Sequence, residues 1–110
     1  MQQVILVDDE RSVRYSARQW LELSDFQVAD FADARLALRT ITPDYTGIVL
    51  TDVKMPGLDG LAFQKMIADI DPHIPVVLFT GHGDIAMAVE AIRGGAYDFV
   101  EKPFDPERIV

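Results

Sequence analysis

The sequence places acidic, hydroxyl and ammonium side chains within two residues after short apolar runs. These chemically capable residues are Asp8, Asp9, Asp52, Thr80 and Lys102. Carboxylates that meet at one site repel one another unless a cation joins them. The chain has no cysteine, and neither His73 nor His82 follows an apolar run among the acids. An all-oxygen ligand set favours Mg²⁺ or Mn²⁺ over Zn²⁺, so the pattern predicts a site for a hard divalent cation.

The same residues predict phosphoryl transfer. Mg²⁺ usually keeps several waters and accepts a phosphate oxygen, which leaves room for a phosphorylated partner. Asp52 would be the nucleophile beside the metal. Thr80 offers a hydroxyl donor and Lys102 a positive charge, both useful where negative charge grows during the reaction. The expected product is an aspartyl phosphate.

Apolar runs rich in β-branched residues predict a parallel sheet that positions these side chains. The runs are Val4–Val7, Ile48–Leu50, Val76–Phe79 and Tyr97–Val100, with the more mixed Phe26–Phe31 as an edge-strand candidate. They are continuous rather than alternating, which indicates strands covered on both faces. Ligands of open parallel sheets bind beyond the carboxyl ends of the strands, so the five residues are expected to gather there.

Segments with helical spacing alternate with these runs. They are Ser12–Leu23, a helix capped by Asp33 that reaches Ile41, a third from Asp59 to Ile70, and a fourth from Asp84 that ends at Gly94 and Gly95. In the first helix, Trp20 is expected to pack inward while Arg14 and Arg18 face water. The fourth is expected to bury Val89 and Ile92. Alternation of strand and helix predicts a doubly wound α/β fold.

The composition and the C-terminal residues indicate the number of domains, the kinds of partner and the location of the protein. The 110 residues suit one domain, residues 1–110, and 49% of them are apolar. A net charge of −8 argues against binding to nucleic acid or anionic lipid. No signal peptide or apolar span is visible, which favours a cytoplasmic protein. Asp105 and Pro106 look like the start of a fifth helix that is incomplete at Val110, so we expect a longer parent protein.

Four separated segments resemble the receiver domain of bacterial two-component response regulators. They are VDDE ending at Glu10, TDVKMPGLDG at 51–60, FTGHGD at 79–84 and EKPF at 101–104. The resemblance implies a flavodoxin-like fold, in which a five-stranded parallel sheet of order 2-1-3-4-5 is flanked by helices. It implies a signalling switch that a histidine kinase phosphorylates, rather than an enzyme.

The resemblance also implies a role for each motif residue. Asp52 would accept the phosphoryl group, and Mg²⁺ would be held by Asp8, Asp9, Asp52 and the backbone carbonyl of Lys54. Thr80 and Phe99 would act as switch residues, and Lys102 would pair with the phosphoryl group.

A finer resemblance concerns the segment from Thr80 to Val110. It is similar to receivers that precede an AAA+ ATPase and a DNA-binding domain in activators of sigma-54 RNA polymerase, notably the C4-dicarboxylate transport regulators. This implies those output domains as partners in the full-length protein, and a homodimer.

Three alternatives stay open. A phosphohydrolase of the haloacid-dehalogenase type also forms an aspartyl phosphate, but it needs an aspartate two residues after the nucleophile, where this chain has Lys54. A flavodoxin-type flavin carrier shares the architecture, but it needs a hydroxyl- and glycine-rich loop where this chain has DDERS. A receiver-like interaction module that is never phosphorylated is the third.

Overall fold

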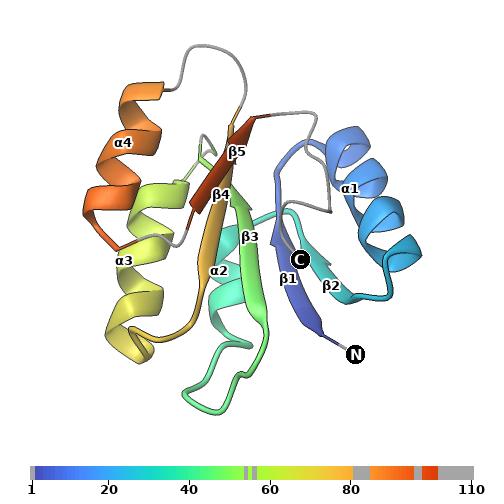
Figure 1. The fold of residues 1–110 in the computed structure, drawn as a ribbon, viewed down its shortest axis with the longest axis horizontal. Coiled ribbons are helices and arrows are strands. Elements are labelled where there is room, and N and C mark those ends of the chain that lie inside the picture. Colours follow the sequence, from blue (N-terminus) through green and yellow to red (C-terminus); the bar gives the residue numbers. More distant parts are fainter. Residues whose placement is uncertain (1, 54, 56, 81–84, 96–97, 102–110) are drawn as a thin grey trace.

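The computed structural model describes residues 2–53, 55, 57–80, 85–95 and 98–101. The strands are β1 (Gln3–Val7), β2 (Gln27–Phe31), β3 (Ile48–Asp52), β4 (Val76–Thr80) and β5 (Asp98–Glu101). The helices are α1 (Arg11–Leu23), α2 (Ala34–Leu38), α3 (Gly60–Ile70) and α4 (Ile85–Arg93). All strand pairs are parallel, and the sheet has the order β2-β1-β3-β4-β5 (Figure 1). The predicted fold class and strand order are confirmed.

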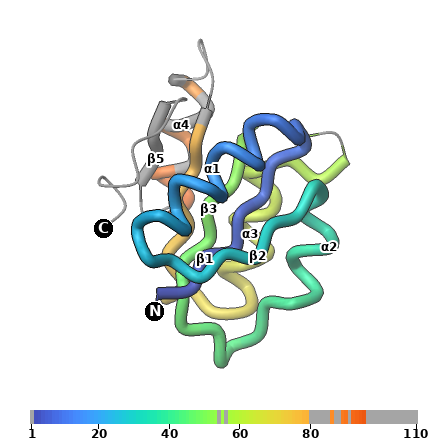
Figure 2. The backbone as a smooth tube through the Cα atoms, turned by 90° about the vertical axis from the view of Figure 1, so that its right-hand side faces the viewer, coloured from blue at the N-terminus to red at the C-terminus, as the bar shows by residue number. Residues whose placement is uncertain are grey.

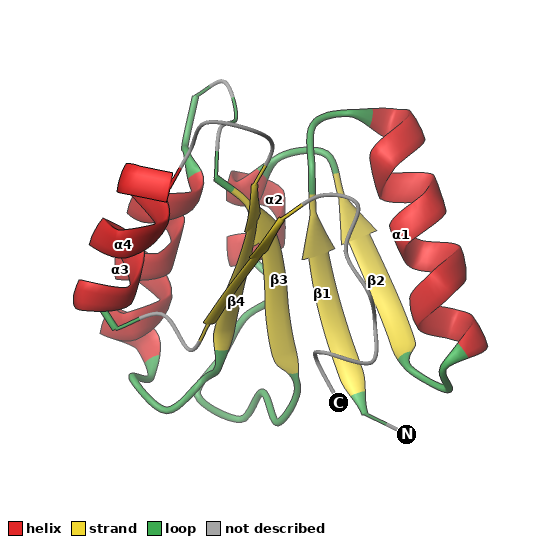
Figure 3. Ribbon diagram, turned by 45° about the horizontal axis from the view of Figure 1, so that its top comes forward, coloured by secondary structure: helices red, strands yellow, loops and turns green. Residues whose placement is uncertain are grey.

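Helices cover both faces of the sheet, which explains the continuous apolar strands. In β1, Ile5 and Val7 pack in a core with residues of α2 and α3, whereas Val4 and Leu6 pack with residues of α1. All four side chains are at most 4% exposed. Figure 2 shows α1 and α2 on opposite sides of the sheet, and Figure 3 shows the strands between the helical layers. A strand buried on both faces needs apolar residues at every position.

The predicted caps and ends of the helices are largely confirmed. The Asp33 side chain accepts a hydrogen bond from the Arg35 amide at 2.8 Å. The Asp59 side chain accepts one from the Ala62 amide at 2.9 Å. Helix α4 ends before Gly95, whose φ of +107° is in the left-handed region. Asp84 and the expected fifth helix lie outside the described residues.

Helix α2 is shorter than predicted. It ends at Leu38, and the Thr40 hydroxyl donates to the carbonyl of Ala37 at 2.8 Å. Such a local bond competes with continuation of the helix. Ile41 is nevertheless 5% exposed, so the apolar spacing predicted its burial correctly but overestimated the helix.

Three helical side chains are more exposed than predicted. Trp20 is 56% exposed, because α1 buries Ala17 and Leu21 and leaves the indole on its outer flank. Val89 and Ile92 are 43% and 40% exposed. Helix α4 packs against β4, β5 and α3, and in the described part of the chain no helix covers its other flank. Among the described residues, no helix has both the length and the apolar content needed to cross a bilayer.

Candidate metal centre

Three carboxylates converge where β1 and β3 end. Asp8 and Asp9 follow β1 directly, and Asp52 is the last residue of β3. The two strands are neighbours, with Val7 beside Thr51. One carboxylate oxygen from each aspartate lies within 4.8 Å of the others. The predicted meeting of these three acids is therefore confirmed.

The acids form a site with one open side. Asp8 is fully buried and Asp52 is 7% exposed, whereas Asp9 is exposed to solvent. Asp8 Oδ1 accepts a hydrogen bond from the Glu10 amide at 2.9 Å, and Asp52 Oδ1 accepts one from the Val53 amide at 2.8 Å. Buried anions need such partners, and a group of them gains further from a cation. The donor set is all oxygen, which fits a hard divalent ion.

A glycine lets α3 begin directly against the Asp52 strand end. A Cβ at Gly60 would lie 2.3 Å from the backbone oxygen of Asp52 and 2.9 Å from Cα of Val53. The Gly60 amide donates to the Val53 carbonyl at 2.8 Å. Any side chain at this position would push α3 away from Asp52. The sequence signal was a glycine directly after the capping Asp59.

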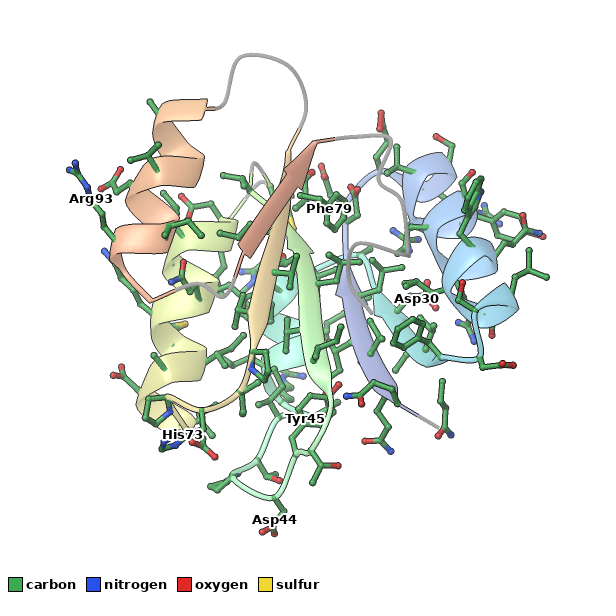
Figure 4. The ribbon with its side chains drawn as sticks, in the orientation of Figure 1. Asp30, Asp44, Tyr45, His73, Phe79 and Arg93 are labelled. Atoms are coloured by element: carbon green, nitrogen blue, oxygen red, sulfur yellow. The ribbon has the colours of Figure 1, made fainter. Side chains whose placement is uncertain are left out.

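Two arginines of α1, Arg14 and Arg18, form a hydrogen-bond network beside the acids. This network was not predicted from the sequence. Arg14 Nη1 donates to the backbone carbonyl of Asp8 at 2.7 Å, and its Nε donates to Asp30 of β2 at 3.0 Å. Arg18 also bonds to Asp30, and this hydrogen bond raises the pKa of Arg18 above its ordinary value. Figure 4 shows Asp30 between β2 and α1. The Arg14 side chain is only 16% exposed, so the prediction that it faces water is wrong.

The remaining predicted site residues are only partly described. Thr80 ends β4 and pairs with Glu101, while the preceding Phe79 pairs with Asp52, so the Thr80 backbone lies at the same end of the sheet. Phe99 lies within β5 and pairs with Leu78. Lys54 and Lys102 lie outside the described residues, so their roles stay predictions.

His73 lies away from the acids, as the sequence analysis expected. It precedes β4 at the opposite end of the sheet (Figure 4). Its amide and its ring both bond to Asp71, at 2.9 and 3.2 Å. The backbone hydrogen bond is the main cause of a lowered pKa of Asp71. His82 is outside the described residues.

The comparisons with known proteins agree with this geometry. The sequence profile of the response regulator receiver domain matches residues 4–110. The chain belongs to this family. The C4-dicarboxylate transport transcriptional regulatory protein DctD of Rhizobium meliloti is 51% identical to this receiver domain over 107 residues. The match covers 97% of the chain but 23% of DctD, so the receiver domain spans less than a quarter of that relative.

Other relatives extend the same conclusion. The transcriptional regulatory protein FixJ of Bradyrhizobium diazoefficiens is 39% identical, over 96% of this chain and 52% of its own length. The crystal structure of FixJ-N has a TM-score of 0.88 at 39% identity and covers 99% of this chain and 87% of that chain. The beryllofluoride-activated NtrC4 receiver domain dimer has a TM-score of 0.87 at 38% identity, covering 98% and 89%.

Proposed function

We propose that this receiver domain, residues 1–110, is a switch that accepts a phosphoryl group on Asp52 from a histidine kinase and uses Mg²⁺ to do so. The observation that supports this most is the approach of the Asp8, Asp9 and Asp52 oxygens to within 4.8 Å of one another. Purely structural acids gain nothing from such closeness, since like charges repel.

The chemistry follows from the acceptor and its surroundings. An oxygen of the Asp52 carboxylate forms a bond to phosphorus, and the bond from phosphorus to the kinase imidazole nitrogen breaks. The imidazole keeps the electron pair of that bond, and its ring is neutral if the second nitrogen holds a proton. The bond from the Val53 amide holds Asp52 in one orientation. A bound Mg²⁺, held by the three aspartates and the Lys54 carbonyl, would offset the negative charge of the phosphoryl oxygens.

The partly described residues have roles in the same proposal. Thr80 ends β4 beside the strand of Asp52, and its hydroxyl would donate to the phosphoryl group. Lys102 would place a positive charge there, since it follows the last residue of β5. Phe99 would take up the space that Thr80 leaves as it moves, which changes the surface of α4 and β5.

The output is proposed from the relatives. DctD and FixJ carry names of transcriptional regulatory proteins, and each is longer than this chain. Together with the resemblance of the segment from Thr80 to Val110 to sigma-54 activators, these relatives lead us to propose a cytoplasmic regulator whose further domains include an AAA+ ATPase and a DNA-binding domain that act with sigma-54 RNA polymerase. A homodimer is proposed because a similar solved receiver, NtrC4, is described as a dimer.

Acetyl phosphate with Mg²⁺ tests the acceptor. We expect intact mass spectrometry to show one added phosphoryl group on the wild-type chain and none on Asp52→Asn. Asp44→Asn is the matched control, because it makes the same chemical change at an exposed loop residue (Figure 4). Uptake by Asp52→Asn at the wild-type rate would show that another residue is the nucleophile. Multiple turnover of a small phosphate ester would instead favour the phosphohydrolase.

A further inference from the structure

Arg14 connects the acid cluster to the neighbouring edge strand. Its guanidinium bonds to the Asp8 carbonyl at 2.7 Å with one nitrogen and to Asp30 at 3.0 Å with another. Both side chains are largely buried, with 16% of Arg14 and 25% of Asp30 exposed. A rigid guanidinium fork that spans two acceptors fixes their relative positions better than a single-point ammonium can.

The carbonyl that Arg14 binds belongs to the peptide unit between Asp8 and Asp9. The orientation of this peptide determines where Asp9 lies relative to the buried Asp8. The Asp8 amide donates to the Phe31 carbonyl of β2 at 3.2 Å. Both backbone groups of Asp8 are therefore tied to β2, one directly and the other through Arg14 and Asp30.

Arg14 also closes the first turn of the helix that follows the acids. Its amide donates to the Glu10 carbonyl at 3.0 Å, while the Glu10 amide donates to the Asp8 side chain at 2.9 Å. One residue thus contacts the loop that contains Asp8 and Asp9 from two directions. The carboxylates repel one another, and the Arg14 bonds hold this loop in place against that repulsion.

We propose that Arg14 is a positioning residue for the metal site, which holds the Asp8–Asp9 peptide in the orientation that cation binding requires. This inference rests on the proposed function, because it assumes that the acids bind a divalent cation. Groups that orient metal ligands typically change metal affinity by about 10- to 100-fold when they are removed.

Binding of Mn²⁺, followed through the electron paramagnetic resonance of the free ion, tests the inference without any activity. We expect Arg14→Gln to weaken Mn²⁺ binding about tenfold, at the lower end of that range. Arg14→Lys should fall between this variant and the wild type, because an ammonium replaces one of the two bonds. Should Arg14→Gln fail to fold, the lysine variant takes its place in the comparison.

Arg18→Gln is the matched control. Arg18 bonds to the same Asp30 and to Glu22, so its loss perturbs the network while the bond to the Asp8 carbonyl stays. We expect less than a twofold change in Mn²⁺ affinity. Equal affinities of the two glutamine variants would overturn the inference. If Asp9→Asn still abolishes binding in that case, the proposed function stands; if the wild type binds no Mn²⁺, the proposed metal site fails first and the inference with it.

The dependence of phosphorylation on Mg²⁺ separates positioning from general damage. For Arg14→Gln, the Mg²⁺ concentration that gives half the maximal rate with acetyl phosphate should rise about tenfold, in line with the affinity. The rate at saturating Mg²⁺ should stay near that of the wild type. A lowered plateau with unchanged half-saturation would contradict the positioning role.

Discussion

Each end of the sheet has a glycine that allows a close backbone approach, but the two ends differ in the groups that surround the glycine. At the carboxyl end, a Cβ on Gly60 would lie 2.3 Å from the backbone oxygen of Asp52. At the amino end, a Cβ on Gly47 would lie 2.3 Å from the backbone oxygen of Gln3. Gly60 lets α3 approach a strand more closely than any side chain allows, and Gly47 does the same for the loop before β3, yet the groups around the two glycines differ in charge.

At the amino end, a half-buried hydroxyl near Gly47 finds its partner within the chain. The half-buried Tyr45 donates its hydroxyl to the Ile48 carbonyl at 2.7 Å, and neither group is charged (Figure 4). The carboxyl end instead gathers Asp8, Asp9 and Asp52, which repel one another. Changes at the amino end should therefore alter stability alone, whereas changes at the carboxyl end should alter cation binding as well.

Alanine at the two glycines should give the largest effects and the clearest contrast. We expect Gly60→Ala and Gly47→Ala each to lower the free energy of unfolding by about 3 kcal/mol, because each methyl group would lie 2.3 Å from a backbone oxygen. Urea unfolding measures both. Only Gly60→Ala should also weaken Mn²⁺ binding, since it displaces α3 from Asp52. An equal loss of affinity in Gly47→Ala would remove the distinction between the two ends.

Mg²⁺ should stabilise the fold through the carboxyl end. At a hundred times its dissociation constant, a cation that binds only the folded chain adds about 2.7 kcal/mol to the free energy of unfolding. We expect this gain in the wild type and in Asp44→Asn, and little of it in Asp9→Asn. Urea unfolding with and without Mg²⁺ makes the comparison. A full gain in Asp9→Asn would mean that the cation binds elsewhere.

Tyr45 should make the amino end sensitive to alkali. Burial raises the pKa of Tyr45 to about 12 from an ordinary 10.0. The unfolded chain therefore loses this proton first, so the stabilising effect is complete below pH 10 and is lost as the pH rises through 12. Tyr45→Phe should be less stable by about 1 kcal/mol at pH 8, for one lost hydrogen bond, and the difference should shrink above pH 10.

Tyr15→Phe controls for the alkaline experiment. Tyr15 is 64% exposed, so Tyr15→Phe makes the same chemical change without removing a buried hydroxyl. Unfolding followed from pH 8 to pH 12 distinguishes the variants. A constant difference between the wild type and Tyr45→Phe across this range would show that the buried hydroxyl does not titrate as described.

The features that depend on residues close together in the sequence were predicted correctly. Asp8 and Asp52 could be placed together because each directly follows a buried run, and parallel strands end on the same side. The caps at Asp33 and Asp59 were equally predictable, since a cap bonds to amides two or three residues away. Local spacing is sufficient for such features.

The sequence could not predict which neighbour meets each flank of a helix. Arg14 and Trp20 both lie on α1. From their spacing alone, Arg14 was predicted to face water and Trp20 to pack in the core. The structure reverses them, because Asp30 on β2 pairs with Arg14, and the packed residues Ala17 and Leu21 leave Trp20 on the outer flank. A burial that depends on a partner from another element is decided by tertiary packing.

Two residues that follow helices offer the smallest and most selective test of the amino end. Asp25 follows α1 with a φ of +68°, and Gly95 follows α4 with a φ of +107°. Both precede the starts of strands. We expect Asp25→Gly to raise the free energy of unfolding by about 0.5 kcal/mol, because glycine adopts left-handed backbone without strain. Gly95→Ala should lower it by about 1 kcal/mol.

The Gly95 change isolates backbone conformation, because no atom lies within 4 Å of the added methyl group. Urea midpoints with an unchanged slope measure both effects, and Mn²⁺ affinity should be the same in both variants and the wild type. A loss of stability in Asp25→Gly would indicate that the aspartate side chain stabilises the turn by more than its backbone strain costs. A change in Mn²⁺ affinity in either variant would show that the two ends of the sheet are coupled, which contradicts their separate roles.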